Sequence, residues 1–464
     1  MSFPSYPAYK DSGVEWLGEV PRHWPVYSLK RTVDGCVNGL WGEEPDGEND
    51  IAVIRVADFE RSFATVGLDK LTYRSITAKE KQSRLIKSGD LLIEKSGGGE
   101  KTLVGCVVLF KHEFEAITSN FVARMRPLSE FESQFLCYAF GNLYHGRVNY
   151  PSVKQVTGIQ NLDAESYLQQ RFCFPARVEQ TLIARFLDHE TARIDALIEE
   201  QQRLIELLKE KRQAVISHAV TKGLDPTVSM KDSGVEWLGE VPAHWDVKAL
   251  RYLGECQNGI NIGGEAFGSG SPFVSYGDVH KNDVLPAEVT GLVQSSAEDR
   301  QRYSIDYGDV FFTRTSETVD EIGFSATCLQ KLQNAVFAGF LIRFRPSGNS
   351  LTPGFSKYYF RNQRLRIFFN KEMNLVTRAS LSQDLLKQLP VTLPPVIEQI
   401  KISDFLDKVT AEFASLLEQG LGSIDLLIER RSALISAAVT GKIDVRGWQP
   451  SASVPSPELE LEAV

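Results

Sequence analysis

Two stretches of the sequence carry residue types that could act on phosphate groups. The first, SGGGEKT from Ser96, has the glycines, lysine and threonine of a phosphate-binding loop. Such a loop has glycine directly before its lysine, and here Glu100 takes that place. The second joins Asp90 to Glu94 and Lys95, as in a metal-dependent nuclease. That chemistry needs one residue between glutamate and lysine, and here they are adjacent. Neither stretch predicts an active site.

Other catalytic patterns are also incomplete. Adenine methyltransferases use Asn/Asp-Pro-Pro-aromatic, but the Pro-Pro pair at Pro394 has leucine before it and valine after it. The histidines are dispersed, and His23 and His244 recur inside a Pro-x-His-Trp motif. For these two we expect a histidine that tethers a turn beside a buried tryptophan. The sequence therefore predicts a chain without a catalytic or metal site of its own.

Binding residues are easier to find than catalytic ones. The segments GDLLIEKSGGGEK from Gly89 and GDVFFTRTSETVD from Gly308 each place polar donors after a short apolar run. Loops that follow buried strands are favoured binding positions, although an ordinary polar β-turn would have the same composition. The candidate donors are Lys95, Ser96, Lys101, Arg314, Thr315, Ser316 and Thr318.

Each half of the chain also has a polar or basic stretch that could contact nucleic acid. In the second half, basic residues alternate with aromatic ones between positions 357 and 378, as in a phosphate-contacting surface. A solvated helix face is the alternative. The first half has a less basic counterpart, rich in side chains that can contact base edges. The candidates are Asn149, Tyr150, Lys154, Arg361, Arg364, Lys371 and Arg378.

Composition sets broad limits on the class of protein. The 464 residues carry a net charge of −9, which does not exclude a locally basic face. The six cysteines form no CxxC pattern, as expected for a reducing compartment. No signal peptide or membrane-spanning run is evident. These features predict a cytoplasmic globular protein with more than one core.

The chain is internally duplicated. KDSGVEWLGEVPRHWPV from Lys10 returns as KDSGVEWLGEVPAHWDV from Lys231. Further matches at a shift of about 219 include FVARMRP from Phe121 with FLIRFRP from Phe340. The opening motif and a closing helical segment agree well, and the stretches between them have diverged. This pattern predicts two tandem half-molecules whose middle portions have different tasks.

Two long helices are predicted from the spacing of apolar residues. Residues 177–220 have such residues three or four apart, with Pro175 before the start and Gly223 after the end. The second copy repeats the pattern, and Gly420 and Gly422 are expected to loosen its middle. We expect the two apolar stripes to pack together as an antiparallel coiled coil. The alternative is that each stripe docks on its own module.

The divergent modules are predicted to be mixed domains of about 140 residues. Short β-branched and aromatic runs between turn residues predict strands, as at 51–56, 90–93 and 337–344. Helices are expected within 135–143 and 355–369. The predicted fold class is α+β: two tandem mixed α/β domains, two long helices and a pseudo-twofold internal repeat.

Taken together, these motifs resemble the specificity (S) subunit of type I restriction–modification systems. The resemblance rests on the repeated SGVEWLGEVPxHW, the segments from Gly89 and Gly308, and the PPxxEQxxIxxFLD segments before the helices. It covers about residues 6–445, with Pro-Ala at Pro175 where the family has Pro-Pro. It implies two target-recognition domains that each read one half of a bipartite, gapped double-stranded DNA target.

The resemblance also implies a domain plan. It assigns a scaffold segment and first recognition domain to 1–26 and 27–170, followed by a helical spacer at 171–222. The second copy has a linker with scaffold segment, a recognition domain and a spacer at 223–247, 248–389 and 390–441. A flexible acidic tail would then occupy residues 442–464.

Partners and cofactors follow from the same resemblance. Two methyltransferase (M) subunits would dock on the chain, and two restriction (R) subunits could join them. S-adenosylmethionine, ATP and Mg would be bound by these partners and no cofactor by this chain. Identical M subunits would explain the exact repeat, with Trp16, Trp24, Trp237 and Trp245 as partner-binding residues.

The helix length suggests how the two halves of a target could be spaced. Residues 195–220 would form a helix about 39 Å long, and one turn of B-DNA is about 34–36 Å. Two alternatives remain at this point: the recognition subunit of another restriction–modification type, and a duplicated protein–protein adaptor without a DNA role.

Overall fold

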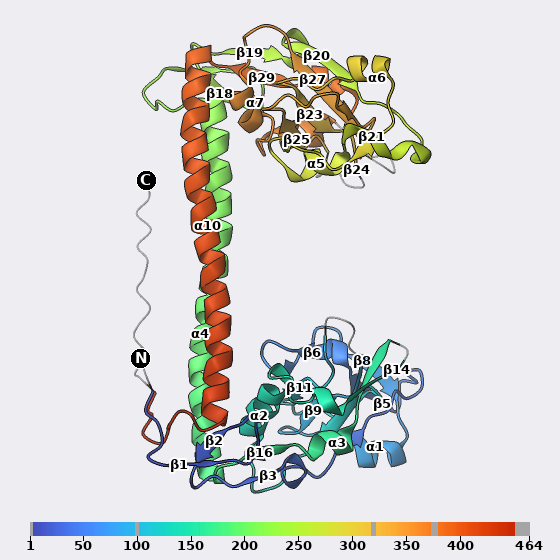
Figure 1. Ribbon diagram of the computed structural model, residues 1–464, viewed down its shortest axis with the longest axis vertical. Coiled ribbons are helices and arrows are strands. Elements are labelled where there is room, and N and C mark those ends of the chain that lie inside the picture. Colours follow the sequence, from blue (N-terminus) through green and yellow to red (C-terminus); the bar gives the residue numbers. More distant parts are fainter. Residues whose placement is uncertain (1–2, 98–101, 157, 317–321, 373–378, 451–464) are drawn as a thin grey trace. The chain divides into compact units, whose positions relative to one another are not determined.

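The chain folds into two units, each of which combines both long helices with one of the divergent modules. In this computed structural model the described residues are 3–97, 102–156, 158–316, 322–372 and 379–450. Unit 1 comprises residues 1–200 and 423–464, and unit 2 comprises residues 201–422. The secondary structure is mixed, as predicted for an α+β protein (Figure 1).

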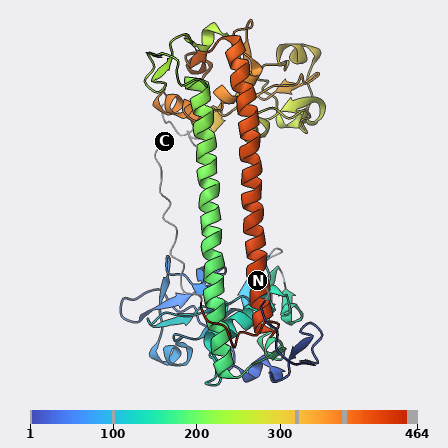
Figure 2. The ribbon, with the colours of Figure 1, turned by 90° about the vertical axis from the view of Figure 1, so that its left-hand side faces the viewer.

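The long helices are those that the apolar spacing predicts. They are α4 (Arg177–Lys222) and α10 (Val396–Val439), and Figure 2 shows both as continuous helices. Part of each helix belongs to unit 1 and the rest to unit 2. The two helices contact each other within each unit. In unit 1 the Arg431 guanidinium pairs with Asp195 at 2.9 Å, and in unit 2 Gly420 packs beside Ile205.

Unit 1 is built around sheets whose strands come from distant parts of the first module. The largest has the order β4 (Val37–Asn38), β13 (Val122–Met125), β9 (Leu91–Glu94), β11 (Val107–Leu109), β7 (Thr65–Val66), β6 (Phe59–Glu60). One three-stranded sheet has the order β12 (Ala116–Thr118), β5 (Asp50–Ile54), β8 (Thr72–Ser75). Another has the order β10 (Ser96–Gly97), β15 (Ile159–Leu162), β14 (Val153–Val156). In addition, β1 (Tyr9–Asp11) pairs with β2 (Glu19–Pro21), and β3 (Val26–Ser28) pairs with β16 (Arg171–Cys173). The helices are α1 (Ala78–Arg84), α2 (Ser133–His145) and α3 (Ala164–Leu168).

Unit 2 repeats this plan with differences. Its largest sheet has the order β20 (Gly254–Asn258), β27 (Leu341–Pro346), β23 (Val310–Thr313), β25 (Ser325–Thr327). A three-stranded sheet has the order β22 (Leu292–Val293), β21 (Phe267–Val274), β26 (Val336–Phe337). The remaining strands form pairs: β24 (Thr315–Ser316) with β28 (Ala379–Ser380), β17 (Met230–Asp232) with β18 (Glu240–Pro242), and β19 (Asp246–Ala249) with β29 (Pro390–Leu393). The helices are α5 (Tyr276–Lys281), α6 (Ala297–Arg302), α7 (Pro353–Tyr359), α8 (Leu365–Glu372) and α9 (Gln383–Lys387).

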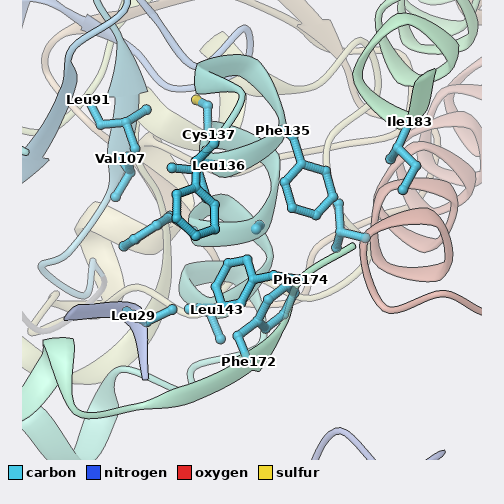
Figure 3. Close-up of a cluster of buried hydrophobic side chains, with 14 of the residues drawn as sticks. Leu29, Leu91, Val107, Phe135, Leu136, Cys137, Leu143, Phe172, Phe174 and Ile183 are labelled. Carbon is cyan, nitrogen blue, oxygen red and sulfur yellow. The ribbon is translucent and has the colours of Figure 1, made fainter. Parts of the chain in front are cut away.

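The core of unit 1 joins the module to the start of α4. Figure 3 shows Phe135 and Leu136 of α2 among buried side chains from the sheet, from β16 and from α4. Ile183 of α4 is fully buried in this same cluster. In unit 2, Phe355 of α7 and Leu406 of α10 share a corresponding cluster. Each module is therefore fixed to a long helix by apolar burial, the dominant favourable term in folding.

The repeated motif forms a joint between the two long helices. In unit 1 the fully buried Trp24 donates its indole N–H to Glu179 near the start of α4, at 3.2 Å. The α10 chain ends beside it at Gly441, whose φ of +74° suits a helix C-terminus. A Cβ at Gly441 would lie 2.3 Å from Cδ of Pro21. Only glycine fits this close approach.

The joint in unit 2 is built in the same way. The fully buried Trp245 donates its indole N–H to Glu398 near the start of α10, at 3.1 Å. Gly223, with a φ of +80°, ends α4 beside Trp245. The histidine of each motif also contacts the same glutamate. The distance from Nε2 to the carboxylate oxygen is 3.0 Å for His23 and Glu179 and 2.8 Å for His244 and Glu398. The expectation of a histidine that tethers a turn beside a buried tryptophan is confirmed.

Some boundaries differ from the predictions. The expected helix 355–369 is broken into α7 and α8, and the run 337–344 divides between β26 and β27. The expected flexible tail is wrong at its start, because Ile443 and Val445 are buried and the Trp448 ring packs edge-on against Phe186. Residues 451–464 lie outside the described residues.

The two glycines expected to loosen α10 do not interrupt it, because α10 runs through both. A Cβ at Gly422 would meet nothing within 4 Å, whereas one at Gly420 would lie 3.1 Å from Cγ1 of Ile205. We predict that Gly422→Ala raises the free energy of unfolding by about 0.5–1 kcal/mol, since alanine loses less backbone entropy in a helix. Thermal unfolding of the full chain measures this change.

Gly420→Ala is the matched control. Its methyl group must displace Ile205, so we expect a smaller gain or a loss of stability. A lower melting temperature for Gly422→Ala would contradict the account of α10 as an uninterrupted helix.

Candidate nucleic-acid interface

The segments from Gly89 and Gly308 are anchored by equivalent ion pairs, in which the carboxylates are buried. The Asp90 carboxylate receives two hydrogen bonds from the Arg126 guanidinium, at 2.8 and 2.7 Å. In unit 2, Asp309 receives the corresponding pair from Arg345, at 2.7 and 2.6 Å. These hydrogen bonds raise the pKa of both arginines, so each guanidinium stays charged. The paired carboxylates fix the positions at which β9 and β23 begin.

The candidate loop residues follow directly where these strands end. The backbone N–H groups of Lys95 and Ser96 donate to the carbonyl of Phe121, at 2.8 and 3.2 Å. In unit 2, the N–H of Arg314 donates to the carbonyl of Phe340 at 2.9 Å. The side chains of Lys95, Arg314 and Thr315 are partly exposed. Both loops therefore hold polar side chains on a fixed backbone at the end of a buried inner strand.

Tertiary structure brings two predicted groups of unit 1 together. β10 pairs with β15, and β15 pairs with β14, so Ser96 and Lys154 lie on one small sheet. Both pair with Asn161, which lies on the middle strand. Its side-chain oxygen accepts a hydrogen bond from the Ser96 hydroxyl at 2.6 Å. Lys154 is exposed and pairs with Asp163 at 2.6 Å. The result is one surface that carries a hydroxyl, an amide and an ammonium group.

Unit 2 has the corresponding arrangement in shorter form. β24 pairs with β28, so that Thr315 lies opposite Ser380. The Arg314 guanidinium donates to the carbonyl of Gly339 at 3.4 Å. Equivalent backbones in the two units thus display different side chains, with Ser96 and Asn161 in one and Thr315 and Ser380 in the other. We call the pair β10 and β15, with Lys95 before β10, the recognition edge of unit 1. The recognition edge of unit 2 is the pair β24 and β28, with Arg314 before β24.

Sequence reasoning missed Asn161 and Ser380, the partners on the second strand of each recognition edge. A usable signal was present, because the two positions are related by the same shift of 219 that aligns the repeats. The pairing itself could not be predicted, because it joins strands more than 60 residues apart.

One predicted binding residue of unit 1 is buried. Asn149 is only 1% exposed, and its amide donates to the carbonyl of Val104 at 2.7 Å. It therefore stabilises the module and is not on the surface, which corrects the prediction. The neighbouring Tyr150 is exposed, as a contact residue should be.

The basic and aromatic stretch of unit 2 is largely structural. Tyr359, Phe360 and Phe369 are buried in the core. Arg361 pairs with Asp283 at 2.9 Å and donates to the carbonyl of Ser325 at 3.0 Å. Burial lowers the pKa of Arg361, although a guanidinium remains charged at any ordinary pH. Arg361 therefore uses its donors within unit 2, and its role as a DNA contact stays a prediction.

Two other candidates of the stretch are exposed. They are Arg364 and Lys371, the second of which pairs with Glu236 at 2.8 Å. Exposed ion pairs of this kind are weak, so Lys371 can still exchange partners. Lys101, Thr318 and Arg378 lie outside the described residues. Ser316 is described as part of β24.

The four repeated tryptophans divide into two kinds. Trp24 and Trp245 are fully buried in the joints, so their side chains are not a docking surface, which corrects that prediction. Trp16 is 39% exposed, and its ring stacks on that of Phe172 with 5.9 Å between the ring centroids. Trp237 is half-buried and packs against the core of unit 2. Of these four tryptophans, only Trp16 and Trp237 are accessible to a partner.

Two further observations limit the class of site. Within the described ranges, no three His, Cys, Asp or Glu side chains gather into a group that could hold a metal ion. Across the same part of the chain, no helix is both long and apolar enough to cross a membrane.

Comparison with known proteins shows which family the chain resembles. Residues 243–423 match the family described as type I restriction modification DNA specificity domain. The chain is 26% identical over 379 residues to the type I restriction enzyme EcoKI specificity subunit of Escherichia coli (strain K12), covering 80% of this chain and 78% of that protein. By these matches the chain is similar to the type I restriction–modification specificity subunits.

Other relatives and solved structures agree. The StySPI specificity subunit of Salmonella potsdam is 21% identical over 374 residues, covering 80% of this chain and 78% of that protein. A chain from a solved type I restriction–modification system has a TM-score of 0.68 at 14% identity, covering 90% of this chain and 98% of that one. The HsdS subunit from Thermoanaerobacter tengcongensis has a TM-score of 0.54 at 15% identity, covering 91% and 98%. The chain therefore shares the fold of these structures.

The contacts of Arg361 lead to a testable prediction about stability. We predict that Arg361→Ala lowers the free energy of unfolding by about 1–3 kcal/mol, because buried carbonyls and the Asp283 carboxylate lose a charged donor. Arg364→Ala, three residues away and exposed, should stay within about 0.5 kcal/mol of the parent. Chemical denaturation of the two variants measures the difference, and equal effects would contradict the structural role of Arg361.

Proposed function

We propose that each module of this specificity subunit recognises one half of a bipartite DNA target through its recognition edge. The observation that carries the proposal is the pair of equivalent edges with different side chains: Ser96 and Asn161 in unit 1, Thr315 and Ser380 in unit 2. Hydroxyl and amide groups can donate to and accept from base edges, which is how sequence is read in the major groove. Two unlike edges on one repeated framework would read two unlike half-sites.

Basic side chains near each edge would supply the sequence-independent part of binding. Lys95 and Lys154 lie beside the edge of unit 1, and Arg314 lies beside that of unit 2. Such side chains neutralise phosphates and release counterions, which fixes a protein on the duplex without reading its sequence. In this proposal Arg364 and Lys371 add phosphate contacts in unit 2.

The repeated parts of the chain would serve identical partners. In this proposal two M subunits dock on the equivalent scaffold of the two units, where Trp16 and Trp237 are the accessible repeated tryptophans. The M subunits would bind S-adenosylmethionine. Two R subunits with ATP and Mg would complete a complex able to cleave DNA, and the specificity subunit itself would be non-catalytic. The expected cytoplasmic location belongs to the same proposal.

The long helices would set the spacing between the two half-sites as an antiparallel pair. α4 has 46 residues and α10 has 44, and each contributes to both units. A continuous helix has a fixed rise of about 1.5 Å per residue, so its length is a property of its residue count. In this role the pair acts as a ruler between two pseudo-twofold related recognition domains.

The first test is a map of N6-methyladenine in the native genome with and without the gene for this chain. We expect one gapped, asymmetric motif to disappear. Replacing the first recognition domain with that of a relative should then change only one half of the motif. The paired strands β3 and β16 mark the boundaries for the exchange, where the N–H of Leu29 donates to the carbonyl of Gln170 at 2.9 Å.

The corresponding exchange in unit 2 is the control. It lies between β19 and β29, where Leu250 and Leu389 form the equivalent hydrogen bond at 2.9 Å. It should change the other half of the motif. If either exchange changed both halves of the motif, the division of labour between the modules would be refuted. If no motif disappeared with the gene, the proposed role in DNA recognition would be refuted.

The ruler has a test of its own. Four residues inserted into α4 between 196 and 204, with four more into α10 between 421 and 430, lengthen each helix by about 6 Å. This length corresponds to roughly two base pairs, so we expect the gap to grow by one or two base pairs while both half-sites stay the same. Methylation mapping measures the gap. Replacing four residues at each place without changing the length is the control, and an unchanged gap after insertion would refute the ruler.

A further inference from the structure

A phenylalanine is exposed at the same position in both modules. Phe121 is 47% exposed and Phe340 is 63% exposed, although the next residues, Val122 and Leu341, are fully buried. Each precedes the strand that pairs with the one ahead of the recognition edge, since β13 pairs with β9 and β27 pairs with β23. A large apolar side chain is thus held beside each recognition edge by a rigid backbone.

Folding does not explain why this side chain occurs in both copies. Other residues shared by the segments from Phe121 and Phe340 have structural tasks, such as the arginines that pair with Asp90 and Asp309. The phenylalanines contribute a backbone carbonyl, which accepts from Lys95 in unit 1 and from Arg314 in unit 2. Any residue could supply that carbonyl. The exposed ring therefore needs another reason.

The surroundings of Phe121 indicate what the ring could contact. It borders a hollow of about 410 Å³, whose other lining residues include Trp41, Ser96 and Ile159. Trp41 and Ile159 are themselves exposed. The hollow therefore combines an apolar wall with the hydroxyl of the recognition edge. A DNA base edge has the same combination, with hydrogen-bonding atoms beside an apolar C5-methyl group when the base is thymine.

We propose that Phe121 and Phe340 make equivalent apolar base contacts in the two half-sites, each against a thymine methyl group in the major groove. This proposal rests on the function proposed above. The phenyl ring has no charge and no polar atom, so it can neither pair with a phosphate nor donate to a base. It discriminates by contact with a methyl group and by excluding water from the neighbouring hydrogen bonds. Phe121 and Phe340 are therefore specificity-determining residues of separate half-sites.

The alternative occupant is an M subunit, and the neighbouring residues argue against it. An identical partner on both sides would favour identical surroundings. Asn120 precedes one phenylalanine and Gly339 the other, and the edges beside them differ as well. An M-subunit contact would have a clear signature, because Phe121→Ala and Phe340→Ala would then impair assembly of the complex and not its sequence preference.

The experiment uses the specificity subunit assembled with its M subunits. We expect Phe121→Ala to weaken binding of the full target by about ten-fold, comparable to one mismatched base pair. It should also relax the methylated motif at one thymine-containing position of the first half-site only. Phe340→Ala should relax the second half-site only. Replacing the contacted thymine with deoxyuridine, which lacks the methyl group, should weaken the parent complex equally and leave the alanine variant unaffected.

The salt dependence of binding separates a base contact from a phosphate contact. Loss of a base contact lowers affinity without changing the slope of log K against log salt, whereas Lys95→Ala should make that slope shallower by about one unit. Phe63→Ala is the matched control, because Phe63 is a similarly exposed phenylalanine of the same module. It should change neither affinity nor the motif.

Several results would overturn the proposal. They are an unchanged motif in both alanine variants, relaxation of both half-sites by one of them, a shallower salt slope, loss of assembly with the M subunits, or equal binding of thymine and deoxyuridine targets by the parent complex. The domain exchanges keep the two proposals apart. If an exchange changes its half-site but the phenylalanine variants do not, this proposal fails and the proposed function stands.

Discussion

Burial of one indole N–H in each copy of the repeated motif is the constraint on which the rest of the structure depends. A buried donor without an acceptor destabilises a fold by about 1–3 kcal/mol, so Trp24 and Trp245 each require one. Glu179 and Glu398 supply it from the start of a long helix. The buried Tyr6 hydroxyl donates to Glu179 as well, and burial with this hydrogen bond raises the Tyr6 pKa far above its ordinary value. The Tyr6 hydroxyl therefore stays protonated, and remains a hydrogen-bond donor, over the physiological pH range.

These joints explain why the motif is repeated so closely. Each one holds the start of one long helix and the end of the other, as Trp24 does with Glu179 and Gly441. Two helices with two ends each need two such joints, and equal geometry requires equal residues. The repeat is thus accounted for by internal structure, before any partner is considered. Accessible residues such as Trp16 remain available for partners.

The divergent modules meet different demands. Their buried anchors are shared, as in the pairs Asp90 with Arg126 and Asp309 with Arg345, because both copies must begin the same strand at the same place. The side chains at the recognition edges are free to differ, since they contribute little to the core. A framework that keeps the backbone and varies the exposed side chains can acquire a new DNA target without a new fold. This separation of tasks is the physical basis of the proposed function.

The amino-acid sequence by itself determined the duplication, the two long helices and the tethering histidines, because these depend on local periodicity and on residues near in the chain. It also placed Lys95 and Arg314 after short apolar runs that are typical of strands. Tertiary structure alone decided which polar residues are exposed. Asn149 and Arg361 have the composition of binding residues, yet long-range contacts with Val104 and Asp283 use their donors internally. Pairing between strands far apart in the sequence also created the recognition edges, because hydrogen bonding across a sheet depends on the fold and not on the neighbouring residues.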